Sequence, residues 1–261
     1  HVRFIFTLQF WNEMLPRHFT NNVIPVKAAI CTAIMHLQGD KFWGGQGPAP
    51  GLPMAWLYSS EGSTGKSRCQ KLINALCGWE KAPLLMGANT SEPALFMSLS
   101  QQSCLSLQVD EITTKEHVKE KNNSTMIKDA VHACFDQSRK ACLQTKESSG
   151  AIKPLTSLIV SSNVLPNATD APLLQRILFL RFMKGEPPAD FDGSSIQEEF
   201  PKMLKVVSCI LPDVESFLVD GELDRDGLSD CTAFTNKLLD THAQRHANMW
   251  GYLLYYMLLM W

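Results

Sequence analysis

The sequence lacks the charge imbalance and the biased composition that mark several special classes of protein. Only 19% of its 261 residues are charged, and 24 Lys and Arg nearly balance 26 Asp and Glu. The formal charge of -2 excludes a histone-like protein, so any contact with nucleic acid must come from a local basic patch. Because 45% of the residues are hydrophobic, the composition also excludes a disordered, collagen-like or coiled-coil chain.

Paired cysteines and long apolar segments are also missing. The eight cysteines never form a C-x-x-C pair, which argues against a zinc site or a disulfide framework and favours a reducing, intracellular compartment. The nucleus, a viral replication compartment and the cytoplasm all fit. No signal peptide is visible, and the apolar run from Met249 to Trp261 is shorter than the ~20 residues that cross a bilayer. We therefore expect no membrane partner, and because the chain stops inside that run, we expect a fragment of a longer protein.

Three segments differ in their pattern. Residues 1–50 form a helical N-terminal segment, most clearly at 25–37, where apolar residues recur on one face and Pro25 suits a first helical turn. Residues 51–184 alternate between short strands and helices, which predicts an α/β layer fold. After the Gly185-Glu186-Pro187-Pro188 break, residues 185–261 form a helical C-terminal segment.

A glycine-rich loop joins a predicted strand to a predicted helix in the central segment. The apolar run Ala55–Tyr58 leads into this loop, and apolar residues at helical spacing follow it until Gly78. This is the context of a P-loop, whose backbone N–H groups surround phosphate oxygens while its lysine reaches the β and γ phosphates and its Ser or Thr binds magnesium. The predicted nucleotide-binding residues are Gly62, Ser63, Thr64, Gly65, Lys66 and Ser67.

One position departs from the P-loop pattern. The first glycine of G-x-x-x-x-G-K-[ST] is replaced by Ser60. If that position requires a positive φ, serine costs about 1 kcal/mol relative to glycine. The alternative interpretation is a Gly/Ser turn with a chance lysine, but the flanking strand and helix favour nucleotide binding.

Two carboxylates follow the predicted strand Leu105–Val109. After a P-loop, Asp110 is expected to hold the magnesium shell, and Glu111 to orient and deprotonate a water that attacks the γ-phosphate in line. The alternative is a solvated strand end. We favour the catalytic interpretation because the pair follows the P-loop by one helix and one strand.

Further polar residues border two other predicted strands. Leu158–Val160 ends in Ser161-Ser162-Asn163, and the neutral amide of Asn163 can hydrogen-bond both the γ-phosphate and the attacking water. An Asx turn before Pro166 explains the same residue equally well. Arg176 stands at the entry to a strand, where an exposed arginine is usually only solvated.

In this order, the four elements resemble the ATPase core of superfamily III helicases, particularly the primase-helicases of large DNA viruses, plasmids and mobile elements. Residues 61–67 are similar to that group's Walker A motif and 109–111 to its Walker B motif. Ser162-Asn163 with Pro166 is similar to motif C and its sensor asparagine, and Arg176 matches the arginine finger. Gln175 leaves a single arginine where relatives often carry two. The resemblance covers residues 57–182, about half of the chain.

The resemblance implies an AAA+-like P-loop NTPase fold, with a five-stranded parallel sheet sandwiched by helices. It also implies a homo-oligomer, a hexameric ring around a nucleic-acid strand, that uses ATP and Mg²⁺. Glu111, Asn163 and Arg176 would then be the catalytic residues, with Arg176 acting across the subunit boundary, and Ser67 and Asp110 the metal ligands.

The family also places a DNA-contacting hairpin between motifs B and C. The corresponding segment here, 115–153, is locally basic, and 142–150 has a hairpin-like composition. Any single basic residue in it can equally belong to a solvated charged face. As a group, Arg139, Lys140 and Lys146 are candidate contacts to single-stranded DNA.

These features predict an ATP-hydrolysing nucleic-acid motor, a DNA helicase or translocase of the replication type. The alternative is an AAA+-type switch or protein-remodelling module without DNA activity, which needs the same ATP chemistry. The basic hairpin distinguishes the two. A small-molecule kinase is disfavoured because it does not need a glutamate that activates water.

Overall fold

The computed structural model describes most of the chain in separate stretches. They are residues 9–39, 51–79, 85–86, 90–102, 105–111, 121–136, 140–145, 148–152, 154–166, 170–185, 193–208, 224–239 and 244–260.

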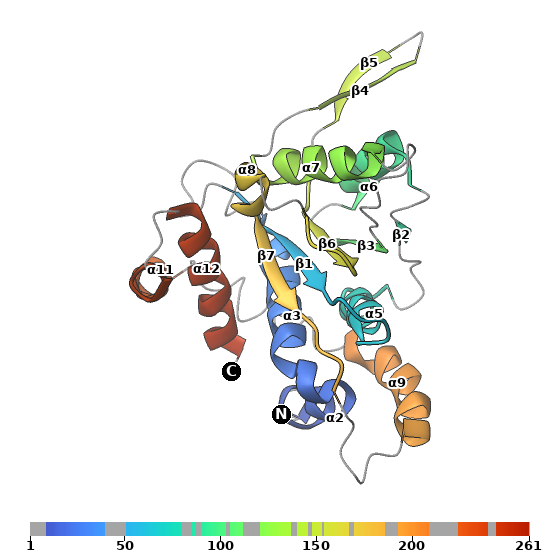
Figure 1. The fold of residues 1–261 in the computed structure, drawn as a ribbon, viewed down its shortest axis with the longest axis vertical. Helices are drawn as coiled ribbons and strands as arrows, with labels where there is room; N and C mark the ends of the chain where they lie inside the picture. Colours follow the sequence, from blue (N-terminus) through green and yellow to red (C-terminus); the bar gives the residue numbers. More distant parts are fainter. Residues whose placement is uncertain are drawn as a thin grey trace.

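A parallel sheet lies at the centre of the molecule (Figure 1). Its five strands are arranged in the order β2-β3-β6-β1-β7. Their bounds are β1 Met54–Tyr58, β2 Leu85–Met86, β3 Leu107–Asp110, β6 Leu158–Ser162 and β7 Ile177–Arg181. Because every pairing is parallel, the carboxyl ends of all five strands lie at one edge of the sheet. The predicted α/β fold with a parallel sheet is confirmed.

The sheet is covered by helices on both faces, as the alternation of buried side chains along β1 shows. Ala55 and Leu57 join one core cluster, with apolar residues of α3 (Val23–Leu37), α5 (Lys66–Leu76), α9 (Gly193–Val207) and α12 (Gln244–Met260). Met54 and Trp56 point to the opposite face and join a second cluster, with α6 (Glu92–Gln101) and α7 (Lys121–Phe135). A strand covered on both faces has apolar residues throughout, which explains the continuous apolar run in the sequence.

The N-terminal and C-terminal helices cover the same face of the sheet. The chain enters through η1 (Phe10–Met14), α2 (Leu15–Phe19) and η2 (Thr20–Asn22), and α12 then packs along α3. α11 (Arg225–Leu239) packs on the outer side of α12 (Figure 1). Within the described residues, no helix is long and apolar enough to cross a membrane.

The helix after the glycine-rich loop ends where the sequence predicts. Gly78 has φ +79°, its N–H donates to Ala75 O at 3.0 Å, and Trp79 N–H donates to Asn74 O at 2.8 Å. This pair of bonds is a Schellman motif, which needs a left-handed residue after the C-cap. Glycine adopts that conformation without the steric cost of a Cβ atom.

A two-stranded hairpin extends beyond α6 and α7, away from the sheet (Figure 1). It consists of β4 (Lys140–Thr145) paired antiparallel with β5 (Ser148–Ile152). It follows α7 along the chain and precedes β6, so the predicted hairpin between the carboxylate pair and Asn163 is confirmed. The short helix α8 (Ala171–Leu174) then leads into β7.

Candidate functional site

The glycine-rich loop, residues 59–65, connects the carboxyl end of β1 to the first residue of α5, Lys66. Gly65 is the N-cap of α5 and has φ +93°. Positive φ also occurs at Ser63, with +58°, whereas Ser60 is not among the positive-φ residues. Ser60 therefore does not carry the left-handed strain that serine would have in place of the first glycine, because the positive φ angles of this loop occur at Ser63 and Gly65.

Lys66 connects the loop to a neighbouring strand. Its Nζ donates to Oδ1 of Asn163 at 2.8 Å and, more weakly, to Glu61 O and Thr64 Oγ1, each at 3.4 Å. Asn163 directly follows β6, the strand beside β1. Only 9% of Lys66 is exposed, and burial lowers the pKa of its ammonium group, while the charge of Asp110 acts in the opposite direction.

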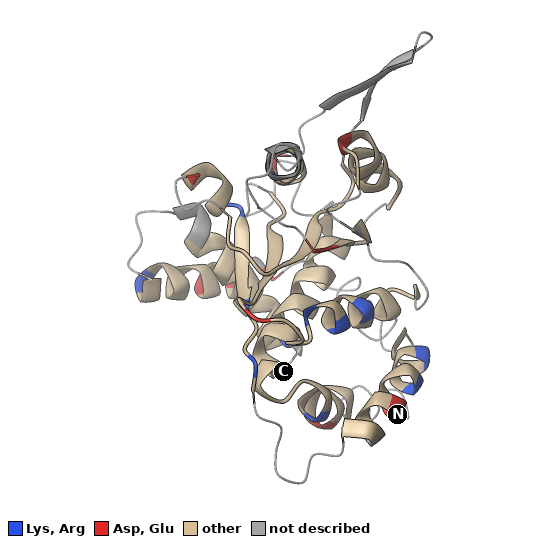
Figure 2. Cartoon of the chain, turned by 45° about the vertical axis from the view of Figure 1, so that its right-hand side comes forward, with Lys and Arg blue, Asp and Glu red and all other residues tan. Residues whose placement is uncertain are grey.

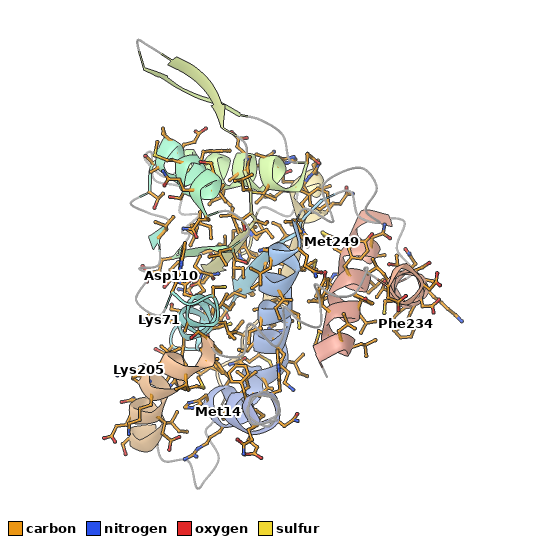
Figure 3. All side chains as sticks on the ribbon, turned by 180° about the vertical axis from the view of Figure 1, so that it is seen from behind. Met14, Lys71, Asp110, Lys205, Phe234 and Met249 are labelled. Atoms are coloured by element: carbon orange, nitrogen blue, oxygen red, sulfur yellow. The ribbon has the colours of Figure 1, made fainter. Side chains whose placement is uncertain are left out.

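Asp110 is the last residue of β3 and is buried at the same edge of the sheet. Its Oδ1 accepts hydrogen bonds from Ser161 Oγ and, at 3.0 Å, from the N–H of Glu111. Figure 3 shows Asp110 at the sheet edge next to α5, the helix that carries Lys71 on its outer side. Ser67, in the first turn of α5, and Asp110 offer the oxygen ligands that Mg²⁺ prefers.

Glu111 follows Asp110 with an unusual backbone. Its φ is +52°, in the left-handed region, and its side chain is exposed. A residue with a Cβ in this region costs roughly 1–2 kcal/mol, and such strain is concentrated at functional sites. The reversal turns the chain out of β3 immediately after the buried Asp110, so that consecutive carboxylates differ completely in exposure.

Two buried amides that the motifs did not indicate hold this site together. Gln70, on the inner face of α5, donates from Nε2 to Val109 O at 2.9 Å and to Ile159 O at 3.1 Å, which attaches the helix to β3 and β6. Asn22, in η2, donates to Thr64 O at 3.1 Å. Gln70 has a signal in the sequence, a polar residue on the apolar face of a helix, whereas Asn22 has none.

Arg176 lies at the amino ends of the strands, at the opposite end of the sheet from Lys66, since its carbonyl accepts from Met54 N, where β1 begins. Only 7% of the residue is exposed. Its guanidinium donates to Pro172 O at 2.7 Å, forms an ion pair with Asp136 at 3.1 Å and lies 5.2 Å from the ring centroid of Phe135. The structure therefore does not bring Arg176 to its own chain's loop, and a role across a subunit boundary remains a prediction.

The candidate DNA contacts are only partly placed. Lys140 is the first residue of β4, and Arg139 and Lys146 lie outside the described residues. In the described part of the chain, Lys and Arg residues are distributed over several helices, α5 and α9 among them (Figure 2).

The fold resembles one solved structure, described as the SCCmec type IV Cch active helicase, with a TM-score of 0.65 and 13% sequence identity. The match covers 96% of this chain and 46% of the helicase, so the chain spans about half the length of the protein it matches. No family model and no curated protein matches the sequence. At this identity the likeness shows a shared helicase-type fold.

Proposed function

We propose that the chain is an ATP-hydrolysing nucleic-acid motor, a DNA helicase or translocase of the replication type. In this proposal it is an AAA+-like P-loop NTPase of the superfamily III kind and acts as an oligomeric, hexameric ring. The observation that carries the proposal is the Lys66–Asn163 hydrogen bond, which links a glycine-rich loop to the end of the adjacent strand. Its occurrence in a helicase-type fold supports the same function.

The residues around Lys66 fit a nucleoside triphosphate. The N-terminus of an eleven-residue helix, opened by a left-handed glycine, presents free backbone N–H groups to a phosphate. Lys66 adds a cation whose charge is little screened because the side chain is buried. In this proposal the loop residues 62–65 and Lys66 bind the α, β and γ phosphates.

Asp110, Glu111 and Asn163 are proposed to bind the metal ion, activate the attacking water and contact the γ-phosphate or that water. Mg²⁺, held by Ser67 and Asp110, supplies charge neutralisation for the phosphates. Glu111, exposed next to the buried Asp110, is free to accept a proton from a water molecule and orient it for attack. Asn163 already accepts from Lys66 through Oδ1, so its Nδ2 is the group that donates to the γ-phosphate or positions the water.

The hairpin of β4 and β5 is proposed to contact single-stranded DNA. It extends away from the sheet and so can reach a strand that the ATP site does not touch (Figure 1). Arg139, Lys140 and Lys146 supply positive charge there, in a chain whose overall charge of -2 gives no general attraction to DNA.

The experiment is an ATPase assay with and without single-stranded DNA on the wild type, Lys66→Ala and Lys71→Ala. Lys71 is an exposed lysine on the same helix, so its variant controls for the loss of one charge from α5. We expect turnover that DNA raises in the wild type and in Lys71→Ala, and no nucleotide binding or turnover in Lys66→Ala. A wild type that binds no ATP overturns the proposal. Turnover that DNA leaves unchanged favours an AAA+-type switch or protein-remodelling module.

A further inference from the structure

We propose that Asn22 is a positioning residue for phosphate binding: its carboxamide holds the peptide bond between Thr64 and Gly65 in the orientation that a phosphate requires. The inference rests on the proposed function, because it concerns the same nucleotide site. Asn22 belongs to η2, 42 residues before Thr64, and lies outside every motif of the sequence.

The side chain of Asn22 makes three hydrogen bonds with two distant backbone segments. Nδ2 donates to Thr64 O at 3.1 Å and to Met183 O at 2.9 Å, and Oδ1 accepts from Met183 N at 2.8 Å. Only 7% of the residue is exposed. A carboxamide has two N–H donors and one carbonyl oxygen, so every group of this side chain has a partner.

This bonding pattern is specific to asparagine. Aspartate keeps an acceptor for Met183 N but loses both donors and places a negative charge against two carbonyl oxygens. Serine is too short to replace three bonds, and glutamine adds a methylene in a buried space. The pattern therefore indicates a residue selected for its hydrogen bonds rather than for its volume.

The bond to Thr64 O acts on the phosphate site through the planarity of the peptide bond. In a trans peptide the C=O and the following N–H point in opposite directions. When Asn22 holds Thr64 O, the N–H of Gly65 must point away from Asn22. Backbone N–H groups of such a loop are the groups that surround phosphate oxygens, and that of Gly65 lies directly before the N-terminus of α5.

Gly65 makes this restraint necessary. Its φ of +93° is a conformation that glycine adopts easily, but glycine also adopts many others. Without an external bond, the peptide between residues 64 and 65 is free to rotate, and binding must then order it. The bond from Asn22 fixes the orientation of this peptide before the nucleotide binds, which reduces the entropic cost of binding.

The two hydrogen bonds with the backbone of Met183 attach the Asn22 side chain to the segment that follows β7. Met183 follows β7, and Phe182 N–H donates to Tyr58 O at 2.7 Å, where β1 enters the loop. The segment runs so close to η2 that a Cβ on Gly185 would lie 1.7 Å from Asn21 Nδ2. The orientation of the loop is thus set from the edge strand of the sheet.

The test compares Asn22→Asp with Asn21→Asp. Asn21 is the exposed neighbour, and its variant makes the same change of charge and size without a bond to Thr64. The measurements are the thermal unfolding of the free protein and, at temperatures below its unfolding transition, the Kd of Mg-ADP by calorimetry and the KM and kcat for ATP. ADP reports binding to the loop without hydrolysis.

We expect the Kd for ADP and the KM for ATP of Asn22→Asp to rise about 10- to 100-fold, as for the loss of one hydrogen bond to a charged group. We expect kcat to change by less than about threefold, because Glu111 and Asn163 are unaltered. Asn21→Asp should match the wild type. If Asn22→Asp does not fold, Asn22→Ser takes its place, with the same direction expected.

The outcomes separate this inference from the proposed function. A folded Asn22 variant with wild-type affinity for ADP overturns the positioning role even if its unfolding temperature falls, because the bonds then only stabilise the fold. An equal loss of affinity in Asn21→Asp also overturns it. A wild type that binds no nucleotide overturns the proposed function itself.

Discussion

Lys66 Nζ donates a 2.8 Å hydrogen bond to Asn163 Oδ1, although the two residues are 97 positions apart in the sequence. The bond forms because β6, which ends just before Asn163, lies next to β1, which leads to Lys66. It places a neutral acceptor, rather than a carboxylate, against a buried ammonium group whose pKa is lowered by burial. The charge of Lys66 is therefore left for another anion.

The first prediction concerns the absence of charge on the Asn163 side chain. Asn163→Asp should weaken ATP binding by about tenfold or more, since a carboxylate at this position pairs with Lys66 and repels the γ-phosphate. Asn163→Ala should lower kcat instead and leave the affinity within a few-fold of the wild type. Titration calorimetry and steady-state kinetics distinguish the two variants. Equal affinities for ATP in Asn163→Asp and the wild type would show that Asn163 does not face the nucleotide.

Glu111 is expected to act as the general base and, through its positive φ, to lower the stability of the fold. Glu111→Gln should bind ATP normally and hydrolyse it about 10²–10⁴-fold more slowly, because a positioned general base contributes that much to the rate. Glu111→Gly should be equally slow and more stable by about 1 kcal/mol, since glycine relieves the strain of a φ of +52°. The measurements are single-turnover hydrolysis and urea unfolding, with the exposed Glu198→Gln as a control. Loss of ATP binding in Glu111→Gln would make the residue structural.

The hairpin should bind DNA through its charge. Changing Arg139, Lys140 and Lys146 together to Ala should weaken binding of single-stranded DNA and flatten its salt dependence, because fewer phosphates then release counterions. Basal ATP hydrolysis should persist. The matched control removes three exposed lysines from α9 and α11: Lys202, Lys205 and Lys237. Wild-type DNA affinity in the hairpin variant would favour the switch or protein-remodelling function.

Arg176 has two possible roles that one pair of variants separates. An arginine finger raises the rate of hydrolysis about 10³–10⁵-fold. If Arg176 is one, Arg176→Ala should bind ATP but hydrolyse it poorly. Asp136→Asn breaks the same ion pair but keeps the guanidinium, so it should retain hydrolysis. If Asp136→Asn loses as much activity as Arg176→Ala, the arginine acts by holding α7 to α8.

Mixing subunits tests the same residue across the boundary. An Arg176→Ala subunit has an intact loop and a Lys66→Ala subunit has an intact finger, so mixed rings should regain activity that neither protein shows alone. Mixed rings that form and stay inactive would exclude a finger in trans at Arg176 and leave Arg181, exposed at the other end of β7, as the next residue to test.

Stability should fall in mild acid because of His36. The side chain is fully buried, its Nε2–H donates to Pro53 O at 2.8 Å and its Nδ1 accepts from Ser106 Oγ at 2.7 Å. Burial lowers its pKa from 6.5 to about 4, despite the bond to Pro53, which raises it. Between these values the unfolded chain binds a proton that the folded chain does not.

The free energy of unfolding should therefore decrease as the pH falls from about 6.5 to 4, by about 2 kcal/mol between pH 7 and pH 5 from this group alone. His18, whose pKa burial also lowers to about 4, acts in the same direction. Urea unfolding at several pH values measures the effect, and His36→Gln should reduce the slope. An unchanged slope in that variant would assign the acid sensitivity to other groups.

Local patterns were enough to predict much of this protein. The strand, glycine-rich loop and helix at 54–78 follow one another directly, so their geometry depends on neighbours in the chain, and the Schellman motif at Gly78 ends the helix as expected. The hairpin was also predictable, because β4 and β5 follow one another closely in the sequence. In each case residues close in sequence make the hydrogen bonds.

The contacts between distant segments were decided by the tertiary structure. The order of strands puts β6 beside β1, and only this order joins Asn163 to Lys66. Asn22 and Arg176 received their partners in the same way, one beside the loop and one buried against Asp136. Bringing such distant segments together costs loop-closure entropy, and packing of the whole core offsets this cost. Because the packing is cooperative, no short stretch of sequence is enough to predict these contacts. The sequence by itself therefore determined which groups are able to bind a phosphate, and the fold determined which of them meet.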